Sequence, residues 1–336
     1  MRVLYIDNRA YGHNIDLHID FISYLSKKKY MDIIPYGKYM NKYLPESISP
    51  NMGNVKAQLD SIVKKKKPDL ILTYNCNGSS YEIGADNVQR YRWVEDFIKN
   101  IDLPKFHVTT DYCRSGFRQD QADWFSYMGY SASLFRHKVS LNLPIEVDKY
   151  WLPFSVDEKL YKKHSIKDIS KKSSNVGFIG ASYNSSRDLY RNRIAAIKFL
   201  TKKSFIEQPK MVNRHKFLRQ ILLREEYVKF LTKNLFGLTC GGTCNYMTAK
   251  YFQIPAANSM LVCTDTVGLE IFPKETYISY SSDKDSLANM LSKVKYYLKN
   301  KKEAEFKIKI LNNYVLKEHS HKKRANGLLK LFKEYV

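Results

Sequence analysis

The chain has 336 residues and 44% hydrophobic content, which suits two domains of roughly 150 residues that each bury a core. Its 56 basic and 33 acidic residues give a formal charge of +23, which attracts polyanions, although AT-rich coding alone also enriches lysine. Apolar runs fall short of the roughly 18 residues of a membrane span, nothing resembles a signal peptide, and the five cysteines form no disulfide framework, so we predict a cytoplasmic protein.

Strand and helix patterns alternate through the first half of the chain. Strands are predicted at residues 2–7, 30–36, 69–74 and 105–109, and helices at residues 15–25, 55–63 and 88–100. This order implies a parallel sheet with helices on both faces. Ligands bind beyond the carboxyl ends of such strands, so we expect the loops at residues 8–14, 75–80 and 110–115 to line one edge.

A polar, lysine-rich stretch follows, and the alternation then restarts. Strands are predicted at residues 175–181, 235–238, 260–263 and 277–280, and helices at 189–200, 247–253, 285–299, 304–317 and beyond 320. We therefore predict an α/β protein with four parts. These are a Rossmann-like domain at residues 1–158, a linker at 159–174, a second Rossmann-like domain at 175–318 and a final helix at 319–336.

Two loops of the second half have the composition of phosphate-binding turns. Gly180 and Ser182 lie between a strand and a helix, and the run Gly241-Gly242-Thr243 follows another strand. Small residues let an anion approach the free N–H groups at a helix start, and Arg187 adds positive charge. Glycine also serves ordinary turn geometry. The sequence contains neither G-x-G-x-x-G nor a Walker A motif, which argues against dinucleotide oxidoreductases and P-loop ATPases.

Several segments between residues 105 and 336 together resemble the CgeB-like spore-maturation glycosyltransferases. They are AKYFQIPAANSMLV at residues 249–262, TDTVGL at 264–269, LKEHSH at 316–321 followed by Arg324, GFIG at 177–180 and FRHK at 135–138. CgeB-like proteins are relatives of the large family 4 of retaining glycosyltransferases. The resemblance implies a GT-B fold, in which two Rossmann-like domains with parallel sheets face a cleft and the C-terminal helix crosses back to the first domain.

The resemblance also implies that the C-terminal half binds a nucleotide-sugar donor, with a UDP-sugar as the first expectation. In family 4, two glutamates eight positions apart approach the donor sugar and the ribose, and their places here hold Asn245 and Gln253. A neutral amide can hydrogen-bond hydroxyls but supplies no negative charge. We expect Tyr246 to belong to the same donor site. Backbone amides and cationic side chains replace a metal in a GT-B site, so we predict no metal site and no essential cofactor.

The N-terminal half of a GT-B enzyme normally holds the acceptor, and its loops carry the candidate catalytic residues. A general base must lie within hydrogen-bond reach of the acceptor hydroxyl, and we select His13 and Asp111 for this role. His13 also fits a polar face of the first helix. Arg9, Arg114 and Arg118 flank these residues and are predicted to hold an anionic acceptor.

Three functions remain open from the sequence. The first is a metal-independent glycosyltransferase of the hexosyltransferase type, acting on a glycan, a glycoprotein or an anionic teichoic-type polymer. The second is a phage-type DNA glycosyltransferase acting on modified bases, which the charge of +23 would suit. The third is a non-catalytic binding protein with a GT-B fold.

Overall fold

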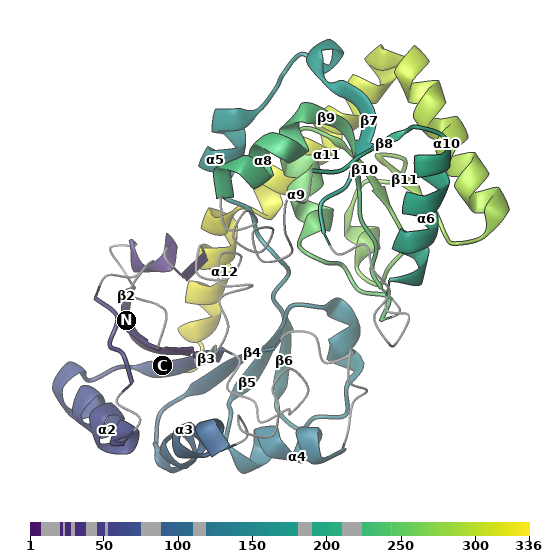
Figure 1. Cartoon of the computed structure of the whole chain (residues 1–336). Helices are drawn as coiled ribbons and strands as arrows, with labels where there is room; N and C mark the ends of the chain where they lie inside the picture. The colour runs from purple at the N-terminus through teal and green to yellow at the C-terminus, as the bar shows by residue number, and fades with distance from the viewer. Residues whose placement is uncertain are drawn as a thin grey trace. The chain divides into compact units, whose positions relative to one another are not determined.

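The computed structural model describes residues 1–7, 21–22, 24–27, 31–37, 46–50, 53–74, 89–109, 119–180, 190–209, 224–242 and 244–336. These residues divide into two compact units, Met1–Pro153 with Ala325–Val336 as unit 1, and Phe154–Arg324 as unit 2. Figure 1 shows that each unit is built around its own sheet. Within the ranges given, no helix is long and apolar enough to cross a membrane.

Unit 1 contains a six-stranded parallel sheet in the order β2-β1-β3-β4-β5-β6. Its strands are β1 (Arg2–Asp7), β2 (Asp32–Tyr36), β3 (Leu70–Tyr74), β4 (Lys105–Thr109), β5 (Ala132–Phe135) and β6 (Asp148–Trp151). Its helices are α2 (Val55–Lys66), α3 (Gln89–Asn100), α4 (Gln119–Tyr127) and the short 3-10 helix η4 (Lys138–Asn142). The α/β alternation predicted for this half is confirmed, and the predicted helix at residues 15–25 lies mostly outside the described residues.

The two faces of the first sheet are covered by parts of the chain that lie far apart in the sequence. Helices α2, α3 and α4 pack on one face, where Val55, Leu59 and Ile62 of α2 are buried at helical spacing. The C-terminal helix α12 (His321–Phe332) packs on the other face. The ring centroid of Phe332 lies 4.7 Å from that of Phe106 in β4. The prediction that the last helix returns to the first domain is therefore confirmed.

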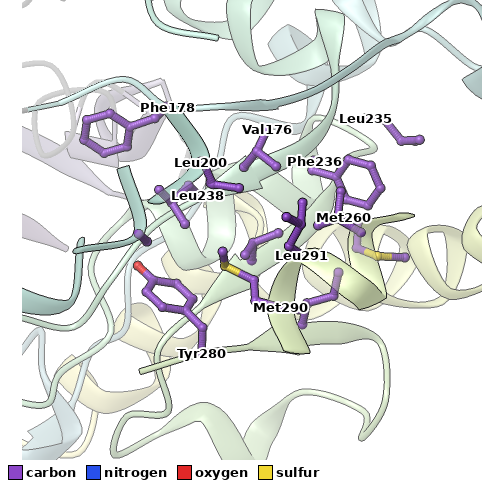
Figure 2. Packing of buried hydrophobic residues seen from close by; sticks show 14 of the residues in the cluster. Val176, Phe178, Leu200, Leu235, Phe236, Leu238, Met260, Tyr280, Met290 and Leu291 are labelled. Atoms are coloured by element: carbon purple, nitrogen blue, oxygen red, sulfur yellow. The ribbon is translucent and has the colours of Figure 1, made fainter. Parts of the chain in front are cut away.

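Unit 2 contains a five-stranded parallel sheet in the order β11-β10-β9-β7-β8. Its strands are β7 (Ser173–Gly177), β8 (Ile206–Glu207), β9 (Asn234–Leu238), β10 (Met260–Cys263) and β11 (Tyr277–Ser279). Its helices are α5 (Glu158–His164), α6 (Arg191–Lys202), α8 (Arg224–Lys233), α9 (Lys250–Ala256), α10 (Lys284–Lys299) and α11 (Lys301–Glu318), with the 3-10 helices η5 (Ile169–Lys171) and η6 (Leu269–Ile271). Figure 2 shows the core of this unit, where Leu200 of α6 and Met290 and Leu291 of α10 pack on Val176 and Phe236 of the strands.

Several boundaries differ from the predictions made from the sequence. The stretch expected as a linker forms α5 and η5 inside unit 2, because Asp157 and Asp168 cap these helices with their carboxylates. The contacts divide the units at Pro153, five residues before the expected boundary. Helix α9 begins three residues later than expected and runs past Pro255, since the Ala257 N–H still reaches the Gln253 carbonyl at 3.0 Å.

A buried histidine in unit 1 provides a test of the first core. His107 of β4 is fully buried, its Nδ1 lies 2.7 Å from the Thr73 hydroxyl oxygen, and burial lowers its pKa to about 3. The unfolded chain takes up this proton below about pH 6.5, whereas the folded protein resists it until about pH 3. The contribution of neutral His107 to the free energy of unfolding is therefore complete at neutral pH and is lost as the pH falls from about 6.5 to about 3.

We expect the free energy of unfolding in urea to fall between pH 7 and pH 5 in both proteins. The fall should be on the order of 2 kcal/mol larger in the parent than in His107→Phe. The comparison uses the change with pH in each protein, so a constant destabilisation of the variant does not affect it. His319, whose pKa is also lowered to about 3 by burial and by the nearby Arg324 charge, keeps part of the acid sensitivity in both proteins. Identical changes in parent and variant would show that His107 does not contribute.

Candidate functional site

The strand order of unit 2 places a ligand site between β7 and β9. From β7 the chain moves outward to β8 and then returns to the other side of β7 to form β9. The connections after β7 and after β9 therefore leave in opposite directions from the carboxyl edge of the sheet. Ligands of open parallel sheets bind at this switch point. The two glycine loops predicted to bind phosphate follow these two strands, at Gly180 and at Gly241-Gly242.

The loop after β9 is held tightly against the next strand. The Gly241 N–H donates to the Thr264 hydroxyl at 2.9 Å, and the Tyr251 hydroxyl donates to the Thr264 carbonyl at 2.8 Å. A Cβ on Gly241 would lie 2.2 Å from Cγ2 of Thr266 and 2.8 Å from the carbonyl oxygen of Tyr246. Only glycine fits at this position, and the backbone of the loop lies close to the sheet edge as a result.

The loop after β7 meets a lysine from the other side of the switch point. The backbone of Gly180 has φ +151°, a conformation that residues other than glycine rarely adopt. A Cβ placed on Gly180 would lie 3.5 Å from Nζ of Lys250 and 3.2 Å from the ring of Phe178. Lys250 is the first residue of α9, which follows the Gly241 loop. Its ammonium group therefore reaches across from β9 to the end of β7.

A second cation lies close to Lys250. Arg193, in the first turn of α6, is only 4% exposed, and its guanidinium carbon lies 3.9 Å from the ring centroid of Tyr190. Burial and, secondly, the positive charge of Arg193 together lower the pKa of Lys250 to about 8, while the thiol of Cys240 acts in the opposite sense. No carboxylate of the described residues lies within 4 Å of the Lys250 ammonium. We call Gly180, Arg193, Gly241, Gly242 and Lys250 the switch-point site.

The predicted donor residues divide into three groups. Gly180, Gly241 and Gly242 lie at the carboxyl edge of the second sheet, as described above. Asn245 is exposed, whereas Tyr246 is buried and pairs with Val267 in an isolated bridge. Gln253 is 7% exposed, and its side-chain oxygen accepts a hydrogen bond of 2.6 Å from the Tyr227 hydroxyl. Ser182, Arg187 and Thr243 lie outside the described residues.

Sequence reasoning missed both cations of the switch-point site. Lys250 lies inside the segment that carries the family resemblance, three residues before Gln253, and Arg193 lies six residues after the predicted Arg187. The signal they share is a helix without acidic residues, since neither α6 nor α9 contains aspartate or glutamate. Such a signal becomes specific only once the topology has brought the two helices to one edge.

The first sheet has its own switch point, between β1 and β3. Asp7 ends β1 there; its carboxylate is buried and accepts a hydrogen bond of 3.1 Å from the Tyr5 hydroxyl. Further along the same edge, the Thr109 and Ser133 hydroxyl oxygens lie 2.9 Å apart. The predicted acceptor residues belong to loops that follow these strands, but all of them lie outside the described residues: Arg9, His13, Asp111, Arg114 and Arg118.

One Asp-x-Asp sequence bears on the prediction that no metal is needed, because metal-dependent glycosyltransferases of the GT-A fold commonly use that pair. It is Asp283-Lys284-Asp285, before and within the first turn of α10. The Asp283 carboxylate caps this helix by accepting from the Ser286 N–H at 2.7 Å. Across the described ranges, no three His, Cys, Asp or Glu side chains lie close enough together to hold a metal ion.

One protein family matches the part of the chain that contains β9 and α9. Residues 207–330 match the model of a family described as glycosyl transferase-like, and this stretch includes β9, α9, Lys250 and the Gly241 loop. No curated protein sequence matches the chain.

Solved structures match over the whole length of the chain. An alpha-glucosyltransferase in complex with UDP and a 13-mer DNA has a TM-score of 0.69 at 11% identity and covers 99% of both chains. A glycosyltransferase from Rickettsia africae has a TM-score of 0.68 at 10% identity, over 99% of this chain and 98% of that one. HepE of Anabaena, in complex with UDP and glucose, has a TM-score of 0.63 at 10% identity, over 99% and 100%. The chain therefore has the fold of the GT-B glycosyltransferases, and the part of it that matches the glycosyl transferase-like family carries Gly241, Gly242 and Lys250 of the switch-point site.

Proposed function

We propose that the chain is a glycosyltransferase that takes a sugar from a nucleotide donor, with a UDP-sugar preferred, and transfers it to a hydroxyl group. The observation that carries the proposal is the pair of cations Arg193 and Lys250 beside two glycine loops at the switch point. Two cations held close together attract a multiply charged anion, because such an anion interacts favourably with both of them. The diphosphate of a nucleotide-sugar is an anion of the right kind.

The same arrangement suits the departure of the nucleotide. As the bond between the sugar and the diphosphate breaks, negative charge develops on the leaving phosphate oxygen. Cations and backbone N–H groups fixed beforehand stabilise that charge without reorganisation, and they supply what a metal ion supplies elsewhere. Lys250 and Arg193 are the cations of this description, and the N–H groups of the Gly180 loop are the expected donors of hydrogen bonds.

The remaining assignments follow the resemblance to the CgeB-like proteins. Gln253 is proposed to approach the ribose, and its bond from Tyr227 fixes the orientation of its amide. Asn245, exposed next to the Gly242 turn, is proposed to approach the sugar. His13 or Asp111 would act as general base toward the acceptor in an inverting reaction.

The acceptor is proposed to be a glycan or an anionic polymer held by Arg9, Arg114 and Arg118. DNA is the second candidate, and two observations favour it: the charge of +23, and the presence of DNA in the alpha-glucosyltransferase structures that share the fold. Binding to a DNA backbone releases counterions and weakens steeply with salt. A duplex whose gel shift disappears between about 50 and 200 mM salt would favour DNA, whereas no shift at either salt would favour a glycan.

A screen of nucleotide-sugars by thermal shift tests the proposal directly. We expect UDP-glucose or another UDP-sugar to raise the melting temperature, GDP-, ADP- and CDP-sugars to raise it less, and chelation of divalent metals to leave the shift unchanged. Slow hydrolysis of the stabilising donor would separate an enzyme from a non-catalytic binding protein. Absence of any shift with all four nucleotides would refute the proposed donor site.

A further inference from the structure

Exposed lysines gather around the turn between α10 and α11. Lys299 ends α10, Lys301 and Lys302 begin α11, and Lys309 lies two turns further along, all with exposed side chains. No carboxylate of the described residues lies within ion-pair distance of any of the four. Lys162 of α5 and Lys229 of α8 behave differently, since each forms an ion pair within its own helix. The four lysines therefore form no direct ion pair with a described carboxylate, and Lys301 interacts with Asp168 only at longer range.

Two of these lysines occupy positions that a helix disfavours. The partial charge at a helix N-terminus is positive, so the first turn normally carries acidic residues and the last turn basic ones. Lys301 and Lys302 are the first two residues of α11. Glu303 is the acidic residue of the same turn, so the two lysines keep an excess of positive charge at this helix start.

Exposed aromatic rings lie among the same lysines. Phe306 of α11 is 65% exposed and Tyr296 of α10 is 49% exposed, the first being the most exposed large hydrophobic side chain of the described residues. Lys302, Phe306 and Lys309 are four and three residues apart, so they share one face of α11.

The two aromatic positions are fixed relative to each other. The Tyr296 hydroxyl donates to the Glu303 carboxylate at 2.7 Å, which ties the end of α10 to the first turn of α11. Glu305 adds one negative charge beside the face that carries Phe306.

The α10–α11 turn lies at the edge of the second sheet opposite to the switch-point site. Helix α10 follows β11 and packs back over the sheet, so its last residues lie toward the amino ends of the strands. Helix α11 packs against η5, which immediately precedes β7. A partner bound at the turn would therefore leave the carboxyl edge of this sheet uncovered.

We propose that this basic–aromatic patch, made of Tyr296, Lys299, Lys301, Lys302, Phe306 and Lys309, docks the chain on an anionic lipid surface. The lysine ammonium groups attract anionic headgroups, and the two rings enter the boundary between headgroups and acyl chains. A nucleic acid backbone would engage the lysines but offers no apolar phase to the ring of Phe306. The inference stands apart from the proposed transfer reaction, because it uses the opposite edge of the sheet.

Sedimentation of the full chain with vesicles tests the proposal. The vesicles are phosphatidylcholine with or without about one third phosphatidylglycerol, and we expect binding only to the anionic ones. Phe306→Ser, and separately the pair Lys299→Glu with Lys302→Glu, should each weaken binding by roughly tenfold or more. The matched control carries Lys64→Glu and Lys65→Glu on the exposed end of α2, the same change of charge in unit 1, and should bind as the parent does.

Two outcomes would overturn the proposal. Equal losses in the control and in the patch variant would mean that net charge alone drives binding. A Phe306→Ser variant that binds like the parent, with duplex DNA displacing the vesicles, would assign the lysines to a nucleic acid instead. All substituted side chains are exposed, so melting temperatures close to the parent's will show that each variant folds.

Discussion

Replacing Lys250 with methionine should weaken binding of UDP by about 10- to 100-fold in a calorimetric titration. A charge-assisted hydrogen bond of the kind an ammonium makes to a phosphate contributes roughly 1.5–3 kcal/mol. Methionine keeps most of the length of the side chain and removes its charge and donors, so α9 and the Gly241 loop should stay in place. Lys250 lies beside the positive charge of Arg193 and forms no ion pair with a described carboxylate. The Lys250→Met protein without bound UDP should therefore be no less stable than the parent.

The dependence of this affinity on pH separates binding from structure. Lys250 in the free protein has a pKa of about 8, lowered first by burial and then by Arg193. A bound diphosphate favours the charged form and raises that pKa, so binding takes up a proton near pH 8. Affinity for UDP should therefore fall by up to about tenfold as the pH rises from 8 to 9, and Lys250→Met should show a flatter profile.

Two further variants serve as controls for the role of the Lys250 charge. Lys250→Arg keeps the charge and should retain most of the affinity, without the decline above pH 8. Lys198→Met removes an equal charge from the exposed side of α6 and should leave binding unchanged. If Lys250→Met binds UDP like the parent while UDP still stabilises both proteins, the donor site is real and Lys250 is not part of it.

The strands were the most predictable part of the fold. The predicted bounds of β1, β4 and β10 agree with the structure residue for residue. These strands lie in the middle of parallel sheets or beside their centre, so every residue after the first is buried, and the sequence shows this as a mostly apolar or β-branched run. Edge and short elements such as β6 and β8 lack that signal and were not predicted.

Lysines were the least predictable side chains, since composition cannot separate solvated lysines from buried ones. Lys172 follows another lysine and was assigned to a solvated linker. It is buried, and its ammonium donates to the carbonyl oxygens of Thr232 and Ala257 at 2.8 and 3.1 Å, below the amino end of β7. The three segments it joins lie up to 85 residues apart, so only the tertiary fold reveals the role.

The candidate site was predictable in its glycines and not in its cations, for a related reason. A local steric requirement allows only glycine at position 241, and the run Gly241-Gly242 already suggests it in the sequence. Lys250 and Arg193, in contrast, come together only because β9 returns beside β7. On the acceptor side the sequence selected loops that follow β1, β3 and β4, and the switch point between β1 and β3 gives the first two of them a topological reason.

The second large effect is expected from Gly241→Ala, which adds a methyl group where the structure has no room. The new Cβ would lie 2.2 Å from Cγ2 of Thr266 and 2.8 Å from the backbone oxygen of Tyr246. The backbone of Tyr246 cannot move away easily, because it pairs with Val267 in a β-bridge and its N–H donates to the Gly241 carbonyl at 3.3 Å. We expect a loss of about 2 kcal/mol in unfolding free energy, as overpacking of fixed sites typically costs, and a loss of UDP affinity of roughly tenfold as the loop shifts.

A compensating substitution shows which contact causes the effect. Thr266→Ser removes the Cγ2 methyl, so the double variant should recover part of the stability while the contact with the Tyr246 oxygen keeps it below the parent. Gly327→Ala is the control, since nothing lies within 4 Å of a Cβ there and the residue is in the interior of α12, where alanine should stabilise by up to about 1 kcal/mol. A Gly241→Ala protein with the melting temperature and UDP affinity of the parent would mean that the loop after β9 yields freely. In that case the close approach of its backbone to the sheet edge would not be what shapes the donor site.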